Sequence, residues 1–190
     1  RPGSVGGRIN EDLCLSQLEE KAFAVAQNAG NVINDRLNQG AASITQDGRM
    51  VIFTACNRED GYGSCDLYMA TREGNRWSEP QNLGANVNTR FWESYPMLSD
   101  DGKTLFFSSA RINVKGSRDI WYCEWNGEGW GKANNMGAPI NSSRDEVAPF
   151  LHADGESFYL ASTFPPGFDK SELFVSYKEA VVAKKFKKKY

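Results

Sequence analysis

Short apolar runs separated by polar turn residues dominate the chain. Met50 to Phe53 and Leu105 to Phe107 are unbroken apolar runs of strand length, as expected for strands that are covered on both faces. The segment 119–124 is rich in β-forming side chains, and Asn126-Gly127 follows it as a hairpin turn. The pattern predicts an all-β protein made of short antiparallel strands.

This pattern repeats with a period of about 53 residues. Asp-Gly pairs stand at Asp47-Gly48, Asp101-Gly102 and Asp154-Gly155, which are 54 and then 53 residues apart, and Trp77 precedes Trp130 by 53 residues. Asp-Gly suits a tight turn because glycine tolerates positive φ and the aspartate accepts hydrogen bonds from nearby backbone N–H groups. A fixed period of this length indicates a repeat protein, here with four short strands in each unit.

A single four-stranded sheet cannot bury both of its faces, whereas sheets stacked radially cover one another. We therefore predict a β-propeller with a tryptophan, Trp77 or Trp130, packing between neighbouring blades. The repeat divides the chain into 1–38 (third and fourth strands of a blade), 39–92 and 93–145 (whole blades) and 146–190 (three strands and a Lys-rich tail). Because propellers close with about four to eight blades, three and a half blades form an incomplete ring. The rest of a propeller or a partner chain is needed to close it.

Composition and charge exclude several classes of function. No apolar stretch approaches the roughly twenty residues that a membrane helix needs, so the chain is expected not to span a membrane. The formal net charge is −2, but five lysines lie in the last seven residues, so the remainder carries −7. An acidic body argues against a nucleic-acid partner. The lysine run is interpreted as a solvated end rather than as a polybasic anchor.

The chain offers little catalytic or metal-binding chemistry. One histidine and no C-x-x-C pair argue against a metal site, and no Gly-x-Ser-x-Gly elbow is present. His152 lies just before the Asp154-Gly155 turn, where a structural role is expected. We therefore predict a protein that is not an enzyme and that binds no cofactor.

The four cysteines fall into two pairs. Cys56 and Cys65 flank the loop that joins the second and third strands of one blade, close enough in a hairpin for a disulfide, with two free thiols as the alternative. Cys14 and Cys123 lie in equivalent third strands but at positions that face opposite ways. They are expected to be unpaired core residues.

Six residues on the predicted loops are candidates for contact with a partner: Arg58, Phe91, Trp92, Glu93, Arg111 and Glu146. The two arginines follow matching second strands, and the two glutamates lead into the innermost strands, where they are expected to face the mouth of the central channel. The neighbouring aromatic pair has the composition of a binding hot spot. The alternative is that all six are solvated or salt-bridged loop residues.

Three stretches carry a resemblance to a known family: Tyr95-Pro-Met-Leu-Ser-Asp-Asp-Gly-Lys-Thr-Leu-Phe-Phe-Ser-Ser, Asp119-Ile-Trp and Trp77-Ser-Glu-Pro-Gln-Asn-Leu-Gly. They resemble the WD-like repeat of the Pro-Asp type, found in TolB-like proteins and in the periplasmic propellers of Bacteroidetes OmpA-family proteins. The resemblance covers about residues 12–177. The segment from Gln39 to Gly48, with the residues around Cys56 and Cys65, looks most like the OmpA-family propellers.

This resemblance implies a non-catalytic interaction scaffold of the bacterial cell envelope. Such a protein is periplasmic or associated with the outer membrane, has protein partners that are in some cases peptidoglycan-linked, and in some cases serves type IX secretion. Two alternatives remain. One is the non-catalytic propeller of a serine peptidase or other hydrolase, and the other is a glycan-binding propeller in which Phe91 and Trp92 stack on sugars.

Overall fold

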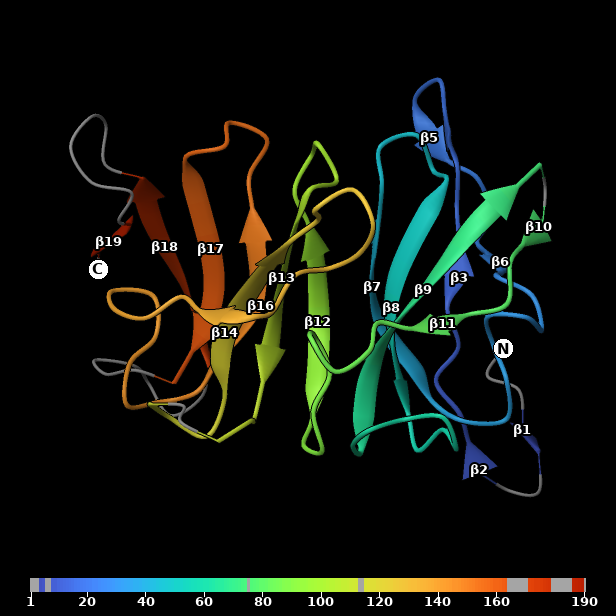
Figure 1. Ribbon diagram of the computed structural model, residues 1–190. Coiled ribbons are helices and arrows are strands. Elements are labelled where there is room, and N and C mark those ends of the chain that lie inside the picture. The colour runs from blue at the N-terminus through green and yellow to red at the C-terminus, as the bar shows by residue number, and fades with distance from the viewer. Residues whose placement is uncertain are drawn as a thin grey trace.

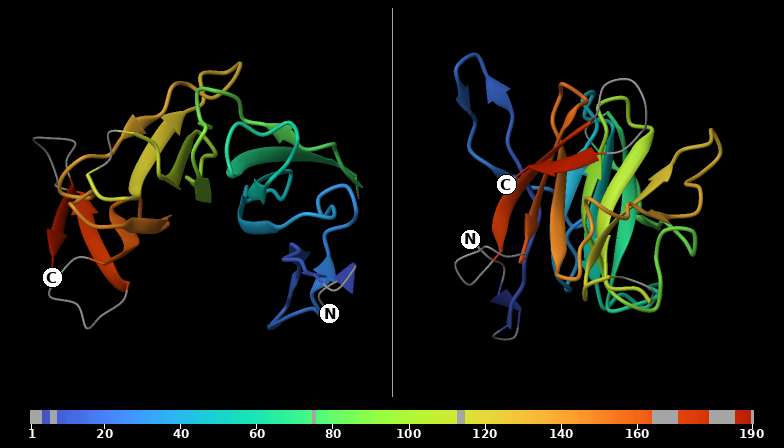
Figure 2. Two further views of the ribbon diagram at one scale, coloured as in Figure 1. Left: turned by 90° about the horizontal axis from the view of Figure 1, so that it is seen from below. Right: turned by 90° about the vertical axis from the view of Figure 1, so that its left-hand side faces the viewer.

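The computed structural model describes residues 4–5, 8–74, 76–112, 115–163, 171–178 and 186–189. All of the regular structure in these ranges is β-strand. Antiparallel sheets stand side by side and fan around a common axis in an open arc (Figure 1; Figure 2, left). The structure therefore confirms an all-β architecture of propeller blades with an incomplete ring.

The first blade, residues 10–38, consists of two short strand pairs. Strands β3 (Cys14–Leu15) and β6 (Gln27–Asn28) pair with each other, and β4 (Leu18–Glu19) pairs with β5 (Ala22–Phe23). A further hairpin, β1 (Ser4–Val5) with β2 (Arg8–Ile9), precedes them. Within the described residues no strand lies at the inner edge of β3.

The other three blades each run from an inner to an outer strand in chain order. The second blade contains β7 (Gln39–Ile44), β8 (Met50–Cys56), β9 (Cys65–Glu73), β10 (Arg76–Trp77) and β11 (Gln81–Asn82). The third contains β12 (Glu93–Leu98), β13 (Thr104–Ser109), β14 (Asp119–Glu124) and β15 (Asn134–Asn135). The fourth contains β16 (Glu146–Leu151), β17 (Ser157–Ser162), β18 (Glu172–Lys178) and β19 (Phe186–Lys189).

The Lys-rich end forms a strand, whereas the sequence predicted three strands followed by a tail. Strand β19 pairs with β18 from Val175↔Lys189 to Lys178↔Phe186, so this segment supplies a fourth strand to the last blade. An outermost strand needs a neighbour on one side only, and lysine is common on such edges because it discourages pairing with other chains. Lys184 and Lys185, which the prediction also included, lie outside the described residues.

The three Asp-Gly turns share one hydrogen bond, which the aspartate accepts from the backbone N–H two residues further on. Asp47 Oδ1 accepts from Thr45 Oγ1 at 2.6 Å and from the Arg49 N–H at 3.0 Å. Asp101 and Asp154 likewise accept from the backbone N–H two residues further on, and the following glycine has φ of +67° in all three turns. These hydrogen bonds lower the pKa of Asp47. The repeated aspartates therefore build the turns of the fold.

Three apolar clusters join neighbouring blades. The cluster between the second and third blades includes Ile52 and Leu67 on one side and Leu105, Phe107 and Trp130 on the other, and each is at most 6% exposed. Truncation of a core aromatic of this kind costs about 3 to 5 kcal/mol. Similar clusters join the first blade to the second and the third to the fourth. Trp77 packs against the cluster between the first and second blades but stays half-buried.

The innermost strand of every complete blade carries a β-bulge at the same repeat position. The pairing register shifts after Gly40, Ser94 and Val147 in β7, β12 and β16. Ala41, Tyr95 and Ala148 have positive φ values of 32°, 53° and 53° there. A bulge redirects the side chains that follow it, so it decides which residues of the inner strand face outward.

Candidate functional site

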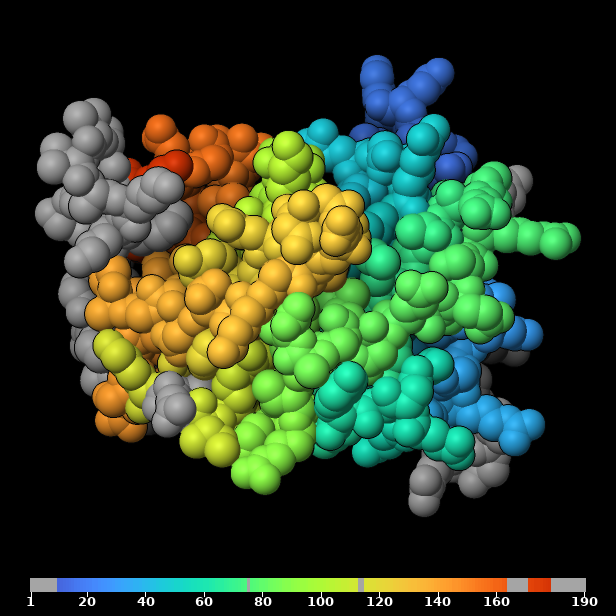
Figure 3. Space-filling view, viewed as in Figure 1, coloured from blue at the N-terminus to red at the C-terminus, as the bar shows by residue number. Residues whose placement is uncertain are grey.

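The connections between blades and the loops between second and third strands gather at one end of the molecule. Segments 57–65 and 89–95 lie side by side there, at the lower end in Figure 3. The Ser64 N–H donates to the Phe91 carbonyl at 3.0 Å, and Cys65 forms an isolated parallel bridge with Trp92. The loop of the second blade therefore positions the connection that enters the third.

The close approach of the loop to the connection requires a glycine, and glycine occupies the equivalent position in the second and third blades. A Cβ atom on Gly63 would lie 1.8 Å from the Phe91 carbonyl oxygen. A Cβ on Gly116 would lie 1.7 Å from the carbonyl oxygen of Arg144, one blade further on. Any larger residue would push the loop away from the connection, which explains why glycine stands at both places.

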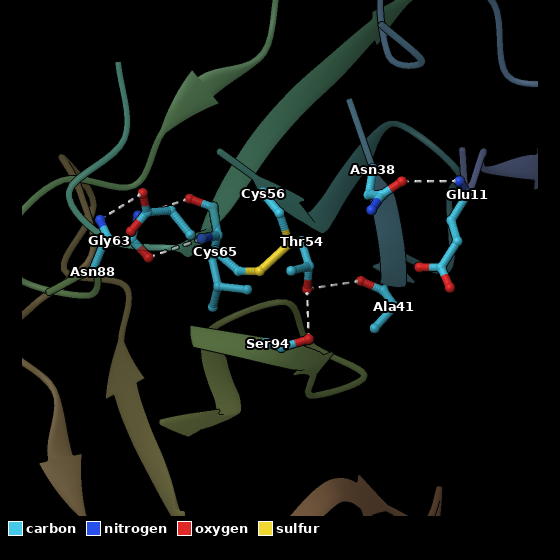
Figure 4. The surroundings of a disulfide bond; sticks show 11 residues. Glu11, Asn38, Ala41, Thr54, Cys56, Gly63, Cys65, Asn88 and Ser94 are labelled. Carbon is cyan, nitrogen blue, oxygen red and sulfur yellow. Dashed lines mark hydrogen bonds between the residues drawn. A yellow bond between two sulfur atoms is a disulfide. The ribbon is translucent and has the colours of Figure 1, made fainter. Parts of the chain in front are cut away.

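A disulfide closes the loop of the second blade at its base (Figure 4). Cys56 and Cys65 are directly paired residues of β8 and β9, with an S–S distance of 2.05 Å. A crosslink around a loop of about ten residues stabilises the fold by about 2 to 3 kcal/mol on the chain-entropy model. Thr54 stands two residues before Cys56, and its Oγ1 lies 3.1 Å from Ser94 Oγ of the neighbouring blade.

The two remaining cysteines differ from each other. Cys123 is buried and free, in agreement with a core position, and burial raises the pKa of its thiol to about 12. Cys14 is exposed, so its prediction as a core residue is wrong. Its repeat equivalent, Tyr68, pairs with Phe53 of β8, whereas β3 has no such neighbour in the part of the chain that the structure describes.

The prediction that Glu93 and Glu146 face the channel mouth is wrong, because both side chains are 0% exposed. The Glu93 carboxylate accepts from the Thr89 N–H at 2.9 Å, from Thr89 Oγ1 at 2.7 Å and from Ser109 Oγ at 2.6 Å. Glu146 accepts from Ser142 and Ser162 in the same way. Burial raises the pKa of Glu93, opposed by these hydrogen bonds and by Arg111. Both glutamates hold the connection against the inner strands.

Arg111 is also part of the fold rather than of a contact surface. Its side chain is 11% exposed, and its guanidinium lies 4.5 Å from the centre of the Trp121 ring. Nη2 donates to the Val87 carbonyl at 2.5 Å, Nε donates to Ser109 Oγ at 2.8 Å, and Nη2 lies 3.5 Å from Glu93 Oε1. Burial lowers the pKa of this guanidinium. Arg111 thus joins two blades. The expectation that its side chain contacts a partner is therefore corrected.

Arg58 is largely held by its neighbours but still borders solvent. Its side chain is 20% exposed and pairs with Asp35 at 2.8 Å and with Asp60 at 3.1 Å. The guanidinium lies 4.8 Å from the centre of the Tyr68 ring. Arg58 lines an open pocket of about 490 Å³ together with segments 35–37 and 59–60. Because its charge is already neutralised by two carboxylates, it is a weak candidate for recognising another protein.

Phe91 and Trp92 belong to a surface that we call the aromatic rim, defined by five residues: Arg90, Phe91, Trp92, Tyr95 and Arg118. The Arg90 guanidinium lies 5.0 Å from the centre of the Phe91 ring, and that of Arg118 lies 4.9 Å from the Trp92 ring. Trp92 and Tyr95 meet edge to face at 5.9 Å.

The aromatic rim is accessible and carries positive charge. Tyr95 is 39% exposed, both arginines are exposed, and Phe91 and Trp92 are half-buried. Neither arginine forms an ion pair with any described residue. Trp, Tyr and Arg are the residues that dominate binding energy at protein interfaces. Sequence reasoning missed Arg90, Tyr95 and Arg118. The bulge that exposes Tyr95 cannot be recognised in the sequence, where Tyr95 is only one position of the repeat.

No catalytic arrangement stands out in the described part of the chain. No group of three or more His, Cys, Asp or Glu side chains there is placed to hold a metal ion. His152 Nδ1 accepts from the Asp154 N–H at 3.2 Å and lies 3.0 Å from its carboxylate, as a turn flank would. None of the described residues forms a helix that is able to cross a membrane.

Comparison with known proteins shows the fold. No family model and no curated protein sequence matches the chain. The chain is similar to the structure of a putative TolB from Agrobacterium tumefaciens, with a TM-score of 0.53 and 16% identity over 80% of this chain and 48% of TolB. A thermostable family-43 glycoside hydrolase is similar with a TM-score of 0.52 and 18% identity over 88% of this chain and 62% of that one.

A puromycin-hydrolysing peptidase of Mycobacterium tuberculosis is also similar, with a TM-score of 0.51 and 13% identity over 81% of this chain and 23% of the peptidase. The chain thus spans about half the length of the TolB structure. At these identities the similarities establish a β-propeller fold, which unrelated binding proteins and enzymes share.

Proposed function

We propose that this chain is a non-catalytic protein-interaction propeller of the bacterial cell envelope, and that a protein partner binds at the aromatic rim. The observation that carries the proposal is the contrast between the rim and the other candidates. Glu93, Glu146 and Arg111 are buried in hydrogen bonds of the fold. The rim keeps an exposed tyrosine at the surface and two guanidinium groups that form no ion pair with a described residue.

Two features support a location in the cell envelope. The disulfide between Cys56 and Cys65 fits an oxidising compartment such as the bacterial periplasm, because cytosolic thiols are kept reduced. The repeat also resembles that of periplasmic OmpA-family propellers. We propose that the chain serves as the propeller part of an OmpA-family-like protein, periplasmic or outer-membrane associated, with peptidoglycan-linked partners and, in some settings, a role in type IX secretion.

The test is a quantitative pull-down from envelope extract with the full chain and matched single variants. Loss of a hot-spot tryptophan costs about 2 kcal/mol or more, which is about thirtyfold in affinity. We expect Trp92→Ala and Arg118→Ala to lose the retained partner. Trp125→Ala should keep it, because Trp125 is 37% exposed but lies away from the rim against Trp130. Equal retention by all variants would contradict the proposal.

Glycan binding is the second candidate, because aromatic rings that reach the surface, here half-buried Trp92 and exposed Tyr95, also stack on sugars. A glycan array that includes peptidoglycan fragments separates the two functions. Binding to a defined glycan that disappears in Trp92→Ala, with no protein retained from the extract, would replace the protein-interaction proposal. We expect no glycan bound above the level of the Trp92→Ala variant.

A further inference from the structure

The last blade exposes an apolar face that the same repeat positions bury elsewhere. Leu67, Ile120 and Leu173 occupy equivalent positions in the third strands of successive blades, opposite Thr54, Ser108 and Ala161. Leu67 and Ile120 are 0% exposed, whereas Leu173 is 75% exposed. All three side chains are aliphatic, so the difference in their exposure arises from the neighbouring residues that cover them.

In the second and third blades, Leu67 and Ile120 are covered by the second strand of the next blade. Leu67 packs in one cluster with Leu105 and Phe107 of β13, and Ile120 packs in one cluster with Phe158 and Leu160 of β17. The forward face of a blade, defined by these third-strand positions and the second-strand residues beside them, therefore receives two large apolar side chains from its neighbour.

The forward face of the fourth blade has the composition of the two covered ones. Tyr159 stands where Phe106 stands in the third blade, paired with Val175 as Phe106 is with Tyr122. Phe150, 51% exposed, adds an aromatic contact to Tyr159 at 6.2 Å between ring centres. Exposed apolar side chains clustered on one face mark an interaction site.

We propose that the forward face of the fourth blade binds one further blade of this same repeat, supplied by polypeptide outside these 190 residues. The proposed occupant is a complete sheet with two large apolar side chains on its second strand. The proposal continues an interface that the structure already shows twice, and it is independent of the aromatic rim.

A head-to-tail second copy of this chain fits the forward face poorly. Its first blade would have to provide the cover, but the described residues of that blade form only the short strands β3 to β6, and none of them is a second strand comparable to β13 or β17. The apolar pair that covers Leu67 and Ile120 would therefore be missing. The blade that binds there must therefore supply its own first and second strands.

The test compares the 190-residue chain with an extended chain in which a second copy of residues 136–190 follows Tyr190. This addition provides the connection that follows β15 and then a fifth blade carrying Phe158 and Leu160. In a Cys14→Ser background, Leu173→Cys reports coverage of the forward face through its rate of reaction with a thiol reagent. Val25→Cys in the first blade, at an 87% exposed position, is the matched control.

We expect Leu173→Cys to react at least about a hundredfold more slowly in the extended chain, because buried thiols are protected until the structure opens. The rate of Val25→Cys should be equal in both chains. Equal rates for Leu173→Cys in the two chains would overturn the proposal. So would protection in the 190-residue chain that accompanies dimerisation in sedimentation experiments, since the occupant would then be a second copy.

Discussion

The side-chain amide of Asn88 forms two hydrogen bonds with the backbone of Leu67. Its Oδ1 accepts from the Leu67 N–H at 2.9 Å and its Nδ2 donates to the Leu67 carbonyl at 2.9 Å. Asn141 bonds Ile120 in the same manner, and Asn34 bonds Leu13. In the first three blades one asparagine thus ties the connection to the third strand, which is a repeated structural role.

We expect Asn88→Asp to destabilise the protein strongly. The aspartate cannot donate to the Leu67 carbonyl, and Asn88 is 1% exposed, so an unpaired polar group or a charge would be buried. The loss is about 1 to 3 kcal/mol for the unsatisfied carbonyl alone. Urea denaturation measures it, with Asn31→Asp at an exposed position as the control that should change stability by less than about 0.5 kcal/mol.

Arg111→Lys tests whether the buried arginine is structural. Lysine lacks the planar fork that reaches Val87 and Ser109 together and stacks on Trp121. We expect a loss of about 1 to 3 kcal/mol in the free energy of unfolding. The matched variant Arg118→Lys, at the exposed aromatic rim, should leave stability nearly unchanged. A similar small effect for both variants would refute the structural role of Arg111.

Gly63→Ala should displace the loop of the second blade. The new Cβ would lie 1.8 Å from the Phe91 carbonyl oxygen, so the connection has to move. Overpacking of this kind costs about 1 to 3 kcal/mol, and the shift should also weaken binding at the aromatic rim. Thermal unfolding measures the first effect. Gly129→Ala, which has no atom within 4 Å of the added Cβ and no positive φ, is the control and should be tolerated.

Thiol counting distinguishes the four cysteines. In the native, unreduced protein only exposed Cys14 should react rapidly at pH 8, because the Cys123 thiol is buried and its pKa is raised to about 12. Denaturation without reduction should expose a second thiol, and reduction should release Cys56 and Cys65. Mass spectrometry after alkylation reads each step. Alkylation of Cys56 or Cys65 before reduction would show that the disulfide is not formed.

The sequence by itself determined the architecture of this protein. The spacing of the Asp-Gly turns, of Trp77 and Trp130 and of the apolar runs gave the period, and a periodic sheet has to cover its faces with its neighbours to exclude water. The period also identified equivalent positions such as Asn88 and Asn141, because the same backbone group needs the same partner in each blade.

Only the tertiary structure decided which equivalent positions are exposed. A strand has two faces, and one bulge reverses them, so the sequence did not distinguish buried Glu93 from exposed Tyr95 two residues later. The contact of Trp92 with Arg118 joins residues 26 positions apart across a connection. Periodicity describes each blade as an average unit, whereas burial depends on the particular neighbour, as the contrast between Ile120 and Leu173 shows.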